Sequence, residues 1–275
     1  MQPAFFDLMA QDESGATLAP RELAASGWTA SHLRGMAVSG ALARAVEAVR
    51  PADPGFAPSR WSVDLFRAAR MEQSTVRARI VRTGGRLSLV EAEFLQGDAP
   101  VARASALFLR RGGRVAGRSW APPDPHPWTD AARGIGLPDT REPRSYFSEG
   151  REWSQSTAGH ADDSRKEILL SPIAIVDGER PTPWQFTAEA ADVASLVQHW
   201  GSAGQEYINA DLNVHLVDLP SGELIRLAAA DRLEHDGIAT GTAHLWDADH
   251  RLGTVTTTAV ANGDHALDPG AILDR

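Results

Sequence analysis

The sequence lacks cysteine altogether and contains a single lysine, Lys166. The absence of cysteine excludes disulfides, thiolate nucleophiles, cysteine-ligated zinc and iron–sulfur clusters. Because Lys166 precedes a glutamate and follows no glycine run, a phosphate-binding G-x-x-x-x-G-K-[ST] loop is also excluded. Lys166 is therefore the one candidate for a lysine Schiff base.

Long hydrophobic runs and an excess of basic residues are missing as well. The longest apolar stretch, residues 168–176, is interrupted by Ser171 and Pro172 and is far too short to span a bilayer. Residues 1–12 carry acidic but no basic side chains, unlike a signal peptide. The 27 basic and 36 acidic residues give a net charge of −9, which argues against binding to nucleic acid or to an anionic membrane. We therefore expect a soluble, cytoplasmic protein with neither of these partners.

An internal repeat divides the 275 residues, enough for two domains, into two similar halves. Segments 90–109 and 241–260 share a strand–turn–strand pattern at an offset of 151 residues (241 minus 90). The same offset relates two alternating triplets, which are typical of half-buried strands: Trp61, Val63, Leu65 and Leu212, Val214, Leu216. It also relates two stripes with helical spacing: Leu42, Ala45, Val46, Val49 and Val193, Leu196, Val197, Trp200. The pattern breaks where Ile80-Val81 faces Asp231-Arg232.

The second predicted helix has a clear start signal. Thr182 supplies an N-cap hydroxyl, Pro183 suits the first helical position, and Gln185 is the reach-back residue of a capping box. Each half is predicted to be a long helix followed by about four antiparallel strands. In the second half we expect a leading strand at 146–156 and another at 168–176. The predicted fold class is α+β, with units at 1–117 and 145–275 joined by a proline-rich linker at 118–144.

Several enzyme motifs are absent or incomplete. There is no G-x-S-x-G elbow, and Gly134-Ile135-Gly136 runs into a proline instead of opening a dinucleotide-binding helix. The nine histidines show no metal-binding spacing, so we expect neither a metal nor a cofactor. A cluster of arginines has two open interpretations, a solvated strand face or a patch for the phosphates of a ligand such as coenzyme A: Arg67, Arg70, Arg77, Arg79 and Arg82.

Three short segments of the second half occur in the order and spacing of a known family: Ala190-Ala191-Asp192, residues 208–212 (I-N-A-D-L) and Arg251-Leu252-Gly253. With the repeat, they resemble the acyl-CoA thioesterase II family of double-hotdog proteins over roughly residues 30–262. The resemblance implies a double hotdog, in which each unit is a long helix wrapped by a curved antiparallel sheet. It also implies an acyl-CoA or other acyl thioester as substrate, and a homodimer or higher homo-oligomer.

The resemblance further implies a catalytic trio. The family has an aspartate on the second helix, a hydroxyl or amide residue before the following strand and a glutamine in the last strand. By position these fall on Asp192, Asn209 and Thr257, so a threonine replaces the glutamine. The first half carries no equivalent chemistry at the corresponding positions: Ala41, Pro58 and Ala106. The family's glycine pair at the first helix is altered, to Arg34-Gly35-Met36.

These residues suggest a hydrolytic mechanism. Asp192 lies at the edge of an apolar stripe, where burial raises the pKa of a carboxyl and makes it a better general base. Asn209 would hold the attacking water, and the backbone N–H groups of Gly35 or Met36 would bind the developing oxyanion. Thr257 reaches less far than a glutamine, and the loss of one positioning donor costs about 10²–10³ in rate.

We therefore predict an acyl-CoA thioesterase-like hydrolase. The alternative is a non-catalytic protein that binds acyl-CoA or an acyl chain in a degraded active site. A double-hotdog hydratase is disfavoured because the D-x-x-P-x-H signature is absent from the helix starts.

Overall fold

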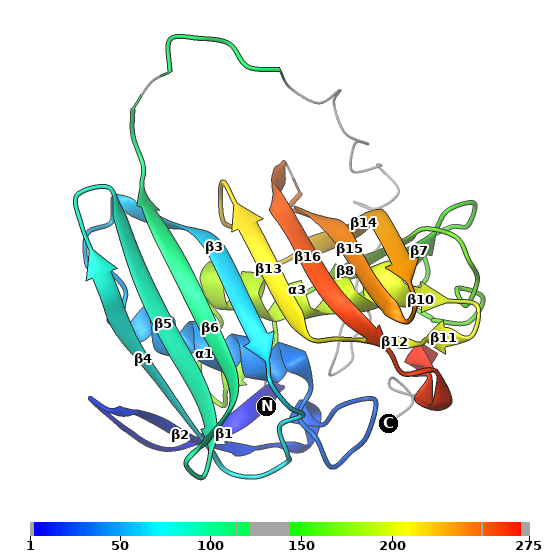
Figure 1. Cartoon of the computed structure of the whole chain (residues 1–275), viewed down its shortest axis with the longest axis horizontal. Coiled ribbons are helices and arrows are strands. Elements are labelled where there is room, and N and C mark those ends of the chain that lie inside the picture. Colours follow the sequence, from blue (N-terminus) through cyan, green and yellow to red (C-terminus); the bar gives the residue numbers. More distant parts are fainter. Residues whose placement is uncertain (1–2, 114, 121–143, 249, 271–275) are drawn as a thin grey trace.

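Two long helices lie against one curved sheet (Figure 1). The computed structural model describes residues 3–113, 115–120, 144–248 and 250–270. The helices are α1 (Gly35–Val49) and α3 (Pro183–His199). No described helix is both long and apolar enough to cross a membrane.

The strands of the first half are β1 (Ala4–Asp12), β2 (Gly15–Pro20), β3 (Phe56–Leu65), β4 (Ser74–Thr83), β5 (Leu87–Gln96) and β6 (Ala99–Arg110). Those of the second half are β7 (Arg144–Ser148), β8 (Lys166–Leu170), β9 (Ala174–Val176), β10 (Trp200–Gly201), β11 (Gly204–Gln205), β12 (Tyr207–Asn209), β13 (Asp211–Leu216), β14 (Ile225–His235), β15 (Ile238–Trp246) and β16 (Arg251–Ala261). Two 3₁₀ turns complete the fold, η1 (Glu22–Ala24) and η2 (Gly263–His265).

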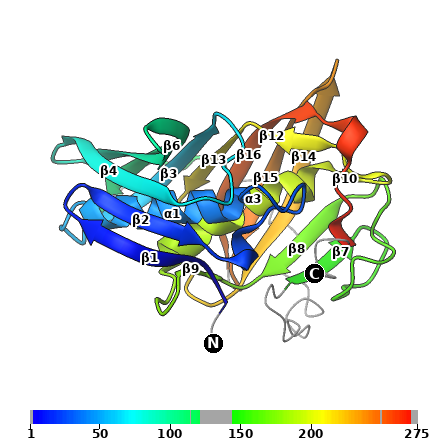
Figure 2. The same cartoon turned by 90° about the horizontal axis from the view of Figure 1, so that it is seen from below.

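The main sheet, 14 strands among the described residues, runs through both halves of the chain. Its order is β7-β8-β14-β15-β16-β13-β3-β6-β5-β4-β2-β1-β9, and β12 also pairs with β16. The halves join at the antiparallel pair β3–β13, where Trp61 faces Val214 and Val63 faces Leu212. At the far edge β9 pairs in parallel with β1. Figure 2 shows α1 and α3 between the β3–β6 part of the sheet and the β1–β2–β9 part.

Both helices share one hydrophobic core. They run antiparallel, since Ser39 Oγ donates to the carbonyl of Ala188 at 2.6 Å while Trp184 Nε1 donates to that of Ala43 at 3.1 Å. Trp61 packs edge-on against Trp184 with ring centroids 5.2 Å apart. Its Nε1 donates to Ser39 Oγ at 3.0 Å. One cluster of buried side chains therefore takes in α1, α3 and strands of both halves.

The offset of 151 residues relates the bounds of corresponding strands. β2, β4 and β5 begin at residues 15, 74 and 87, and β8, β14 and β15 begin at residues 166, 225 and 238. The mismatch at residues 80–81 has a local cause. A β-bulge lies between Ile80 and Arg82 in β4, but between Ala229 and Asp231 in β14. Because a bulge moves the following side chains to the other face of the sheet, bulges at different places break the sequence pattern.

The start of α3 agrees with the sequence in part. Thr182 is the N-cap and accepts the N–H of Gln185 at 3.2 Å, with Pro183 as the first helical residue. The side chain of Gln185 does not complete the capping box. It donates instead to Glu47 on α1 at 2.8 Å, and the hydroxyl of Thr182 donates to the same carboxylate at 2.8 Å. The cap therefore also ties the two helices together.

Two predicted strands have different bounds in the structure. The leading strand predicted at 146–156 is β7, which ends at Ser148 before a turn in which Gly150 has φ 83°. The single strand predicted at 168–176 is two strands, β8 and β9, because Pro172 has no N–H to continue the ladder. Of the linker predicted at 118–144, residues 121–143 lie outside the described part of the chain.

Candidate active site

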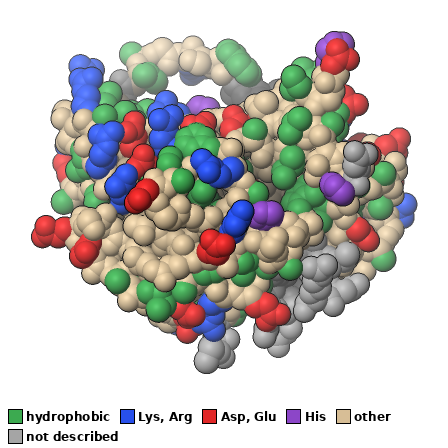
Figure 3. All heavy atoms as spheres, turned by 60° about the horizontal axis from the view of Figure 1, so that its bottom comes forward, with side chains coloured by type: hydrophobic (Ala, Val, Ile, Leu, Met, Phe, Trp, Pro, Cys, Tyr) green, Lys and Arg blue, Asp and Glu red, His purple; other side chains and the backbone are tan. Residues whose placement is uncertain are grey.

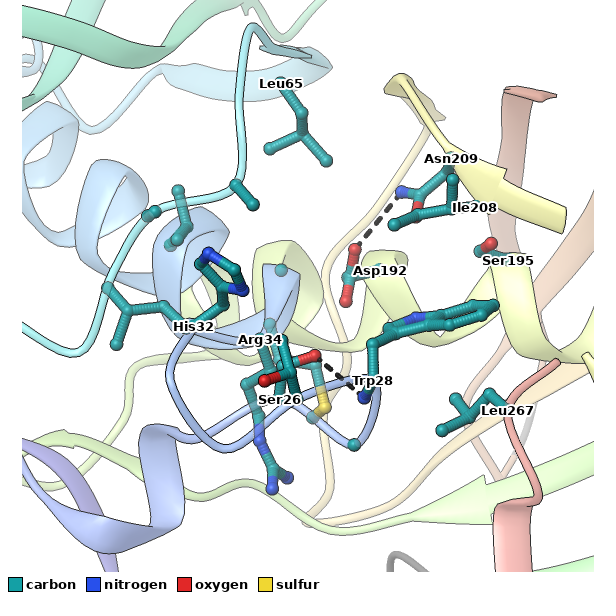
Figure 4. Close-up of a pocket in the computed structure, with 18 of the residues that line it drawn as sticks. Ser26, Trp28, His32, Arg34, Leu65, Asp192, Ser195, Ile208, Asn209 and Leu267 are labelled. Atoms are coloured by element: carbon teal, nitrogen blue, oxygen red, sulfur yellow. Dashed lines mark hydrogen bonds between the residues drawn. The ribbon is translucent and has the colours of Figure 1, made fainter. Parts of the chain in front are cut away.

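A cavity of about 690 Å³ opens between the two halves of the chain, beside the first turn of α1 (Figure 4). Its wall comes from the loop before α1, the end of β3, the middle of α3, β12 and the segment around Leu267. Asp192 and Asn209 both line it. The candidate site thus lies where secondary structure from both halves meets.

Asp192 takes the place of a cap for α1. The N-cap residue of that helix, Arg34, makes no side-chain hydrogen bond to it. Asp192 reaches the helix start from α3, and the N–H of Met36 donates to its carboxylate. A Cβ at Gly35 would overlap the Asp192 carboxylate, so glycine is required for this approach. The free N–H groups and the positive dipole end of a helix stabilise a carboxylate at this position.

Asn209 holds the carboxylate from the other side. Its Nδ2 donates to Asp192 Oδ1 at 3.3 Å and to the carbonyl of Asp211 at 3.5 Å. No described residue donates to the side-chain oxygen of Asn209, which is half-buried at the end of β12. This oxygen can therefore accept a hydrogen bond from a water molecule beside Asp192.

The pKa of Asp192 is set by opposing effects. Burial raises it above the ordinary aspartate value, and this is the largest cause. The hydrogen bonds from Asn209 and Met36 oppose the rise, as do the positive charges of Arg144 and Arg34. Arg144, 7% exposed, is held close by a contact of 3.0 Å between its Nη2 and Met36 Sδ. The result is a carboxyl that binds a proton more tightly than a surface aspartate does.

Of the predicted site residues, the structure brings together Asp192, Asn209, Gly35 and Met36. Thr257 lies elsewhere, on β16 against the C-terminal end of α3. It is 1% exposed, and its Oγ1 donates to Gln198 Oε1 at 2.5 Å and lies 3.4 Å from His199 Nε2. It does not line the cavity. The residue at the position of the family's glutamine is therefore a core residue in this structure.

The repeat relates the Asp192–Gly35 contact to a second position in the molecule, and apolar side chains fill that position. The offset of 151 residues carries Asp192 back to Ala41 and Gly35 forward to Phe186, and both are 2% exposed. The cap of α3 is its own Thr182, and the nearby carboxylate of Glu47 accepts hydrogen bonds from the side chains of Thr182 and Gln185. The site is thus present in one copy of the repeat.

Several polar or aromatic residues that line the cavity were not predicted from the sequence as site residues, among them Trp28, Arg144, Ser195 and Gln205. Ser195 had a readable signal, because it follows Asp192 by three residues and lies on the same helix face. Gln205 lies on the two-residue strand β11, too short to show periodicity. Among the described residues, no group of three or more histidine, aspartate or glutamate side chains could hold a metal ion.

The arginines for which the sequence left two interpretations open, a solvated strand face or a phosphate-binding patch, do not all have the same surroundings. Arg77 and Arg79 form ion pairs with Glu93 and Glu91 on the exposed face of β4 and β5, at 2.9 and 2.6 Å. Figure 3 shows blue and red side chains next to one another over the left of the molecule, where β4 and β5 lie in Figure 1. Arg67 is different, because it lines the cavity and forms no ion pair with a described residue.

Two family models match the sequence. Residues 24–109 match the acyl-CoA thioesterase N-terminal domain, and residues 116–261 match the acyl-CoA thioesterase C-terminal domain. The chain therefore belongs to the acyl-CoA thioesterase family, which confirms the resemblance found in the sequence. A comparison with curated protein sequences gave no match.

Solved structures show the same fold. A Novosphingobium aromaticivorans protein designated a thioesterase is 17% identical, with a TM-score of 0.65 over 92% of this chain and 97% of that one. A Thermobifida fusca protein designated a thioesterase II is 18% identical, with a TM-score of 0.62 over 94% and 96%. A hotdog-fold protein from Alicyclobacillus acidocaldarius is 16% identical, with a TM-score of 0.62 over 92% and 94%. These likenesses establish a hotdog fold for this chain.

Proposed function

We propose that this protein hydrolyses acyl thioesters such as acyl-CoA, with Asp192 as the general base. The observation that carries the proposal is the position of Asp192, a carboxyl of raised pKa that faces a cavity and lies against the start of α1. A base with a raised pKa takes a proton from water more effectively than an ordinary aspartate. We also propose that the halves 1–117 and 145–275 are two hotdog units; association into a homo-oligomer stays a prediction.

The attacking water would lie between Asp192 and Asn209. One of its hydrogens points to the carboxylate and the other to the side-chain oxygen of Asn209, which leaves a lone pair for the thioester carbonyl carbon. As the water oxygen bonds to that carbon, its proton passes to Asp192. When the carbon–sulfur bond breaks, the leaving thiolate takes the proton from Asp192, and the products are a carboxylic acid and a thiol. Thr257 takes no part in this scheme.

The carbonyl oxygen becomes negative during the attack and needs donors. No described residue accepts a hydrogen bond from the N–H of Gly35, which lies at the start of α1 beside Asp192. Because the N-terminal end of a helix favours negative charge, this N–H is suited to the oxyanion. The N–H of Met36 is already directed to Asp192.

The cavity extends to both sides of Asp192. Figure 4 shows His32 and Leu65 on one side, and Trp28, Ser195 and Leu267 on the other. Arg67, which follows Leu65 by two residues, also lines the cavity, and its guanidinium fits the phosphates of a thiol carrier such as coenzyme A. We therefore assign the carrier to the side of Leu65 and the acyl chain to the side of Trp28 and Leu267.

The release of free thiol from acyl-CoAs of several chain lengths tests this proposal. The wild-type protein should release thiol from acyl-CoA. Asp192→Ala should lower the rate of release by about 10²–10⁴, the usual contribution of a general base. Asp64→Ala, an exposed aspartate whose side chain is 57% accessible, is the matched control and should keep full activity. Turnover that is unchanged in Asp192→Ala would contradict the assignment of the base.

The absence of a glutamine at the position carried over from the family favours a second candidate, a binding protein without catalysis. Thioether analogues of acyl-CoA, which resist hydrolysis, separate the two. Tight binding of the analogue by wild-type protein that releases no thiol from any acyl-CoA would support the second candidate.

A further inference from the structure

Two buried polar side chains line the part of the cavity assigned above to the acyl chain. Ser195 is 3% exposed and Gln205 is 4% exposed. Ser195 follows Asp192 by about one turn of α3, so the two side chains are neighbours on one helix face. In Figure 4, Ser195 lies on the side of Asp192 away from His32 and Leu65, near the indole of Trp28. A chain leaving the thioester carbonyl on this side therefore passes Ser195.

The hydrogen bonds of this pair leave one acceptor and one donor unused. Gln205 Nε2 donates to Ser195 Oγ at 3.0 Å and to the carbonyl of Tyr207 at 3.1 Å. The Tyr207 carbonyl fixes the orientation of the amide, because a carbonyl can only accept. Within the described chain no group donates to Gln205 Oε1, and none accepts the hydroxyl hydrogen of Ser195. Since Ser195 Oγ and Gln205 Oε1 flank the same Nε2, the two unused positions lie close together.

An unsubstituted hydrocarbon chain is a poor match for this arrangement. It would remove water from both groups and give nothing in return, which disfavours a ligand by about 5- to 150-fold for each buried polar group left unpaired. A hydroxyl on the chain matches both groups at once. Its O–H donates to Gln205 Oε1, and its oxygen accepts from Ser195. Sites that hydrogen-bond a substrate hydroxyl discriminate strongly against analogues that lack it.

We propose, resting on the thioester chemistry above, that the acyl group taken by this cavity carries a hydroxyl a few carbons from its carbonyl, bound between Ser195 and Gln205. The pair lies about one helical turn from Asp192, which places the hydroxyl near the reacting end of the acyl group rather than at a distant tail. The ligand class is therefore a hydroxyacyl thioester.

Equilibrium binding of non-hydrolysable thioether analogues tests this directly. The probes are the thioether of hexanoyl-CoA and two versions with a hydroxyl on the β or δ carbon, titrated calorimetrically. Wild-type protein should bind one hydroxylated analogue at least about 5-fold more tightly than the plain one. Thiol release from the matching thioesters should show the same preference in kcat/KM.

Two variants and a control locate the effect. Gln205→Leu removes the acceptor and should bring the ratio of the two binding constants to about one, mainly by strengthening binding of the plain analogue. Ser195→Ala removes the donor, leaves the amide in place and should lower the same ratio, so it serves if Gln205→Leu does not fold. Gln198→Leu, at another buried glutamine that does not line the cavity, should leave the ratio unchanged.

The outcomes separate this inference from the proposed function. A hydroxyl preference in binding with no turnover of any thioester would uphold the inference and contradict hydrolysis. Turnover without a hydroxyl preference would uphold hydrolysis and contradict the inference, and would mean that a trapped water molecule donates to Gln205 Oε1. A preference that persists in folded Gln205→Leu and Ser195→Ala, or no binding of any analogue, would overturn the inference.

Discussion

Asp192 is a residue whose environment both disfavours and stabilises its charge. Burial raises its pKa, while Asn209 and the N–H of Met36 hold the ionised form in place. A carboxylate used as a base needs this combination, because it must be ionised before the reaction and must accept a proton during it. Neither effect can be read from Asp192 alone, since the partners come from β12 and α1.

The pH dependence of catalysis follows from this environment. Because Asp192 acts in its ionised form, kcat/KM should fall as the pH drops through its pKa, and the midpoint should lie above the ordinary aspartate value of about 3.9. Asn209→Ala removes a hydrogen bond that lowers the pKa, so it should move the acid limb to still higher pH. Rate profiles of both proteins at constant ionic strength check this. An acid limb at or below the ordinary value would show that another group controls the rate.

Substitution of Gly35 should impair catalysis by displacing the Asp192 carboxylate. A methyl group at this position would overlap the carboxylate, so Gly35→Ala should displace Asp192 and lower kcat/KM by about 10², the usual effect of misplacing a catalytic group. Gly85→Ala is the matched control, because a Cβ there has no atom within 4 Å. Equal activity of the two variants would mean that the helix start tolerates a shift of Asp192.

At the scale of elements, one serine connects three of them. Ser39 on α1 donates to a carbonyl of α3 and accepts from the Trp61 indole of β3. Ser39→Ala would leave the buried Trp61 Nε1 without its acceptor and should lower the free energy of unfolding by about 1–3 kcal/mol. Urea denaturation measures this, with Ser62→Ala on the half-exposed part of β3 as control. A change no larger than that of the control would show that the indole finds another partner.

The elements also show which features could be predicted from the sequence. Period-two and helical spacing were sufficient for the strands around Trp61 and Val214 and for both helices, because each buries one face against a common core. The start of α3 was legible because Thr182 and Pro183 act locally. The parallel pairing of β9 with β1 could not be predicted, because it joins two segments that lie far apart in the sequence. Thr257 shows the corresponding weakness of carrying a role over by position, because a buried strand threonine looks the same in sequence whether it faces a cavity or the core.

At the scale of the whole molecule, the two halves share a sheet and a core. The β3–β13 pair and the contact between α1 and α3 bury the boundary between the two halves in the interior of the molecule, so this boundary is not a hinge. The site depends on this arrangement, since Asp192 comes from the second half and the helix start that it caps comes from the first. The repeat in the sequence predicts the two halves, and the family resemblance, which assigns Asp192 in the second half and Gly35 and Met36 in the first, predicts a site between them; all three residues line the cavity.

The shared core predicts cooperative unfolding. Native-state hydrogen exchange should give the amides of Val90 in β5 and Ala243 in β15, both fully buried, the same free energy of opening. Exchange in one half at a free energy lower by more than about 2 kcal/mol would instead indicate two independently unfolding units.

Single-turnover hydrolysis of an acyl-CoA by Asp192→Asn tests most directly whether Asp192 is the general base. Asparagine keeps the size of the side chain and its ability to accept from the start of α1, but it cannot take a proton. With Asp192 as the general base, the variant should react about 10²–10⁴ more slowly than the wild type, with an unchanged or higher melting temperature. A rate within a few-fold of the wild type in the folded variant would contradict this role of Asp192.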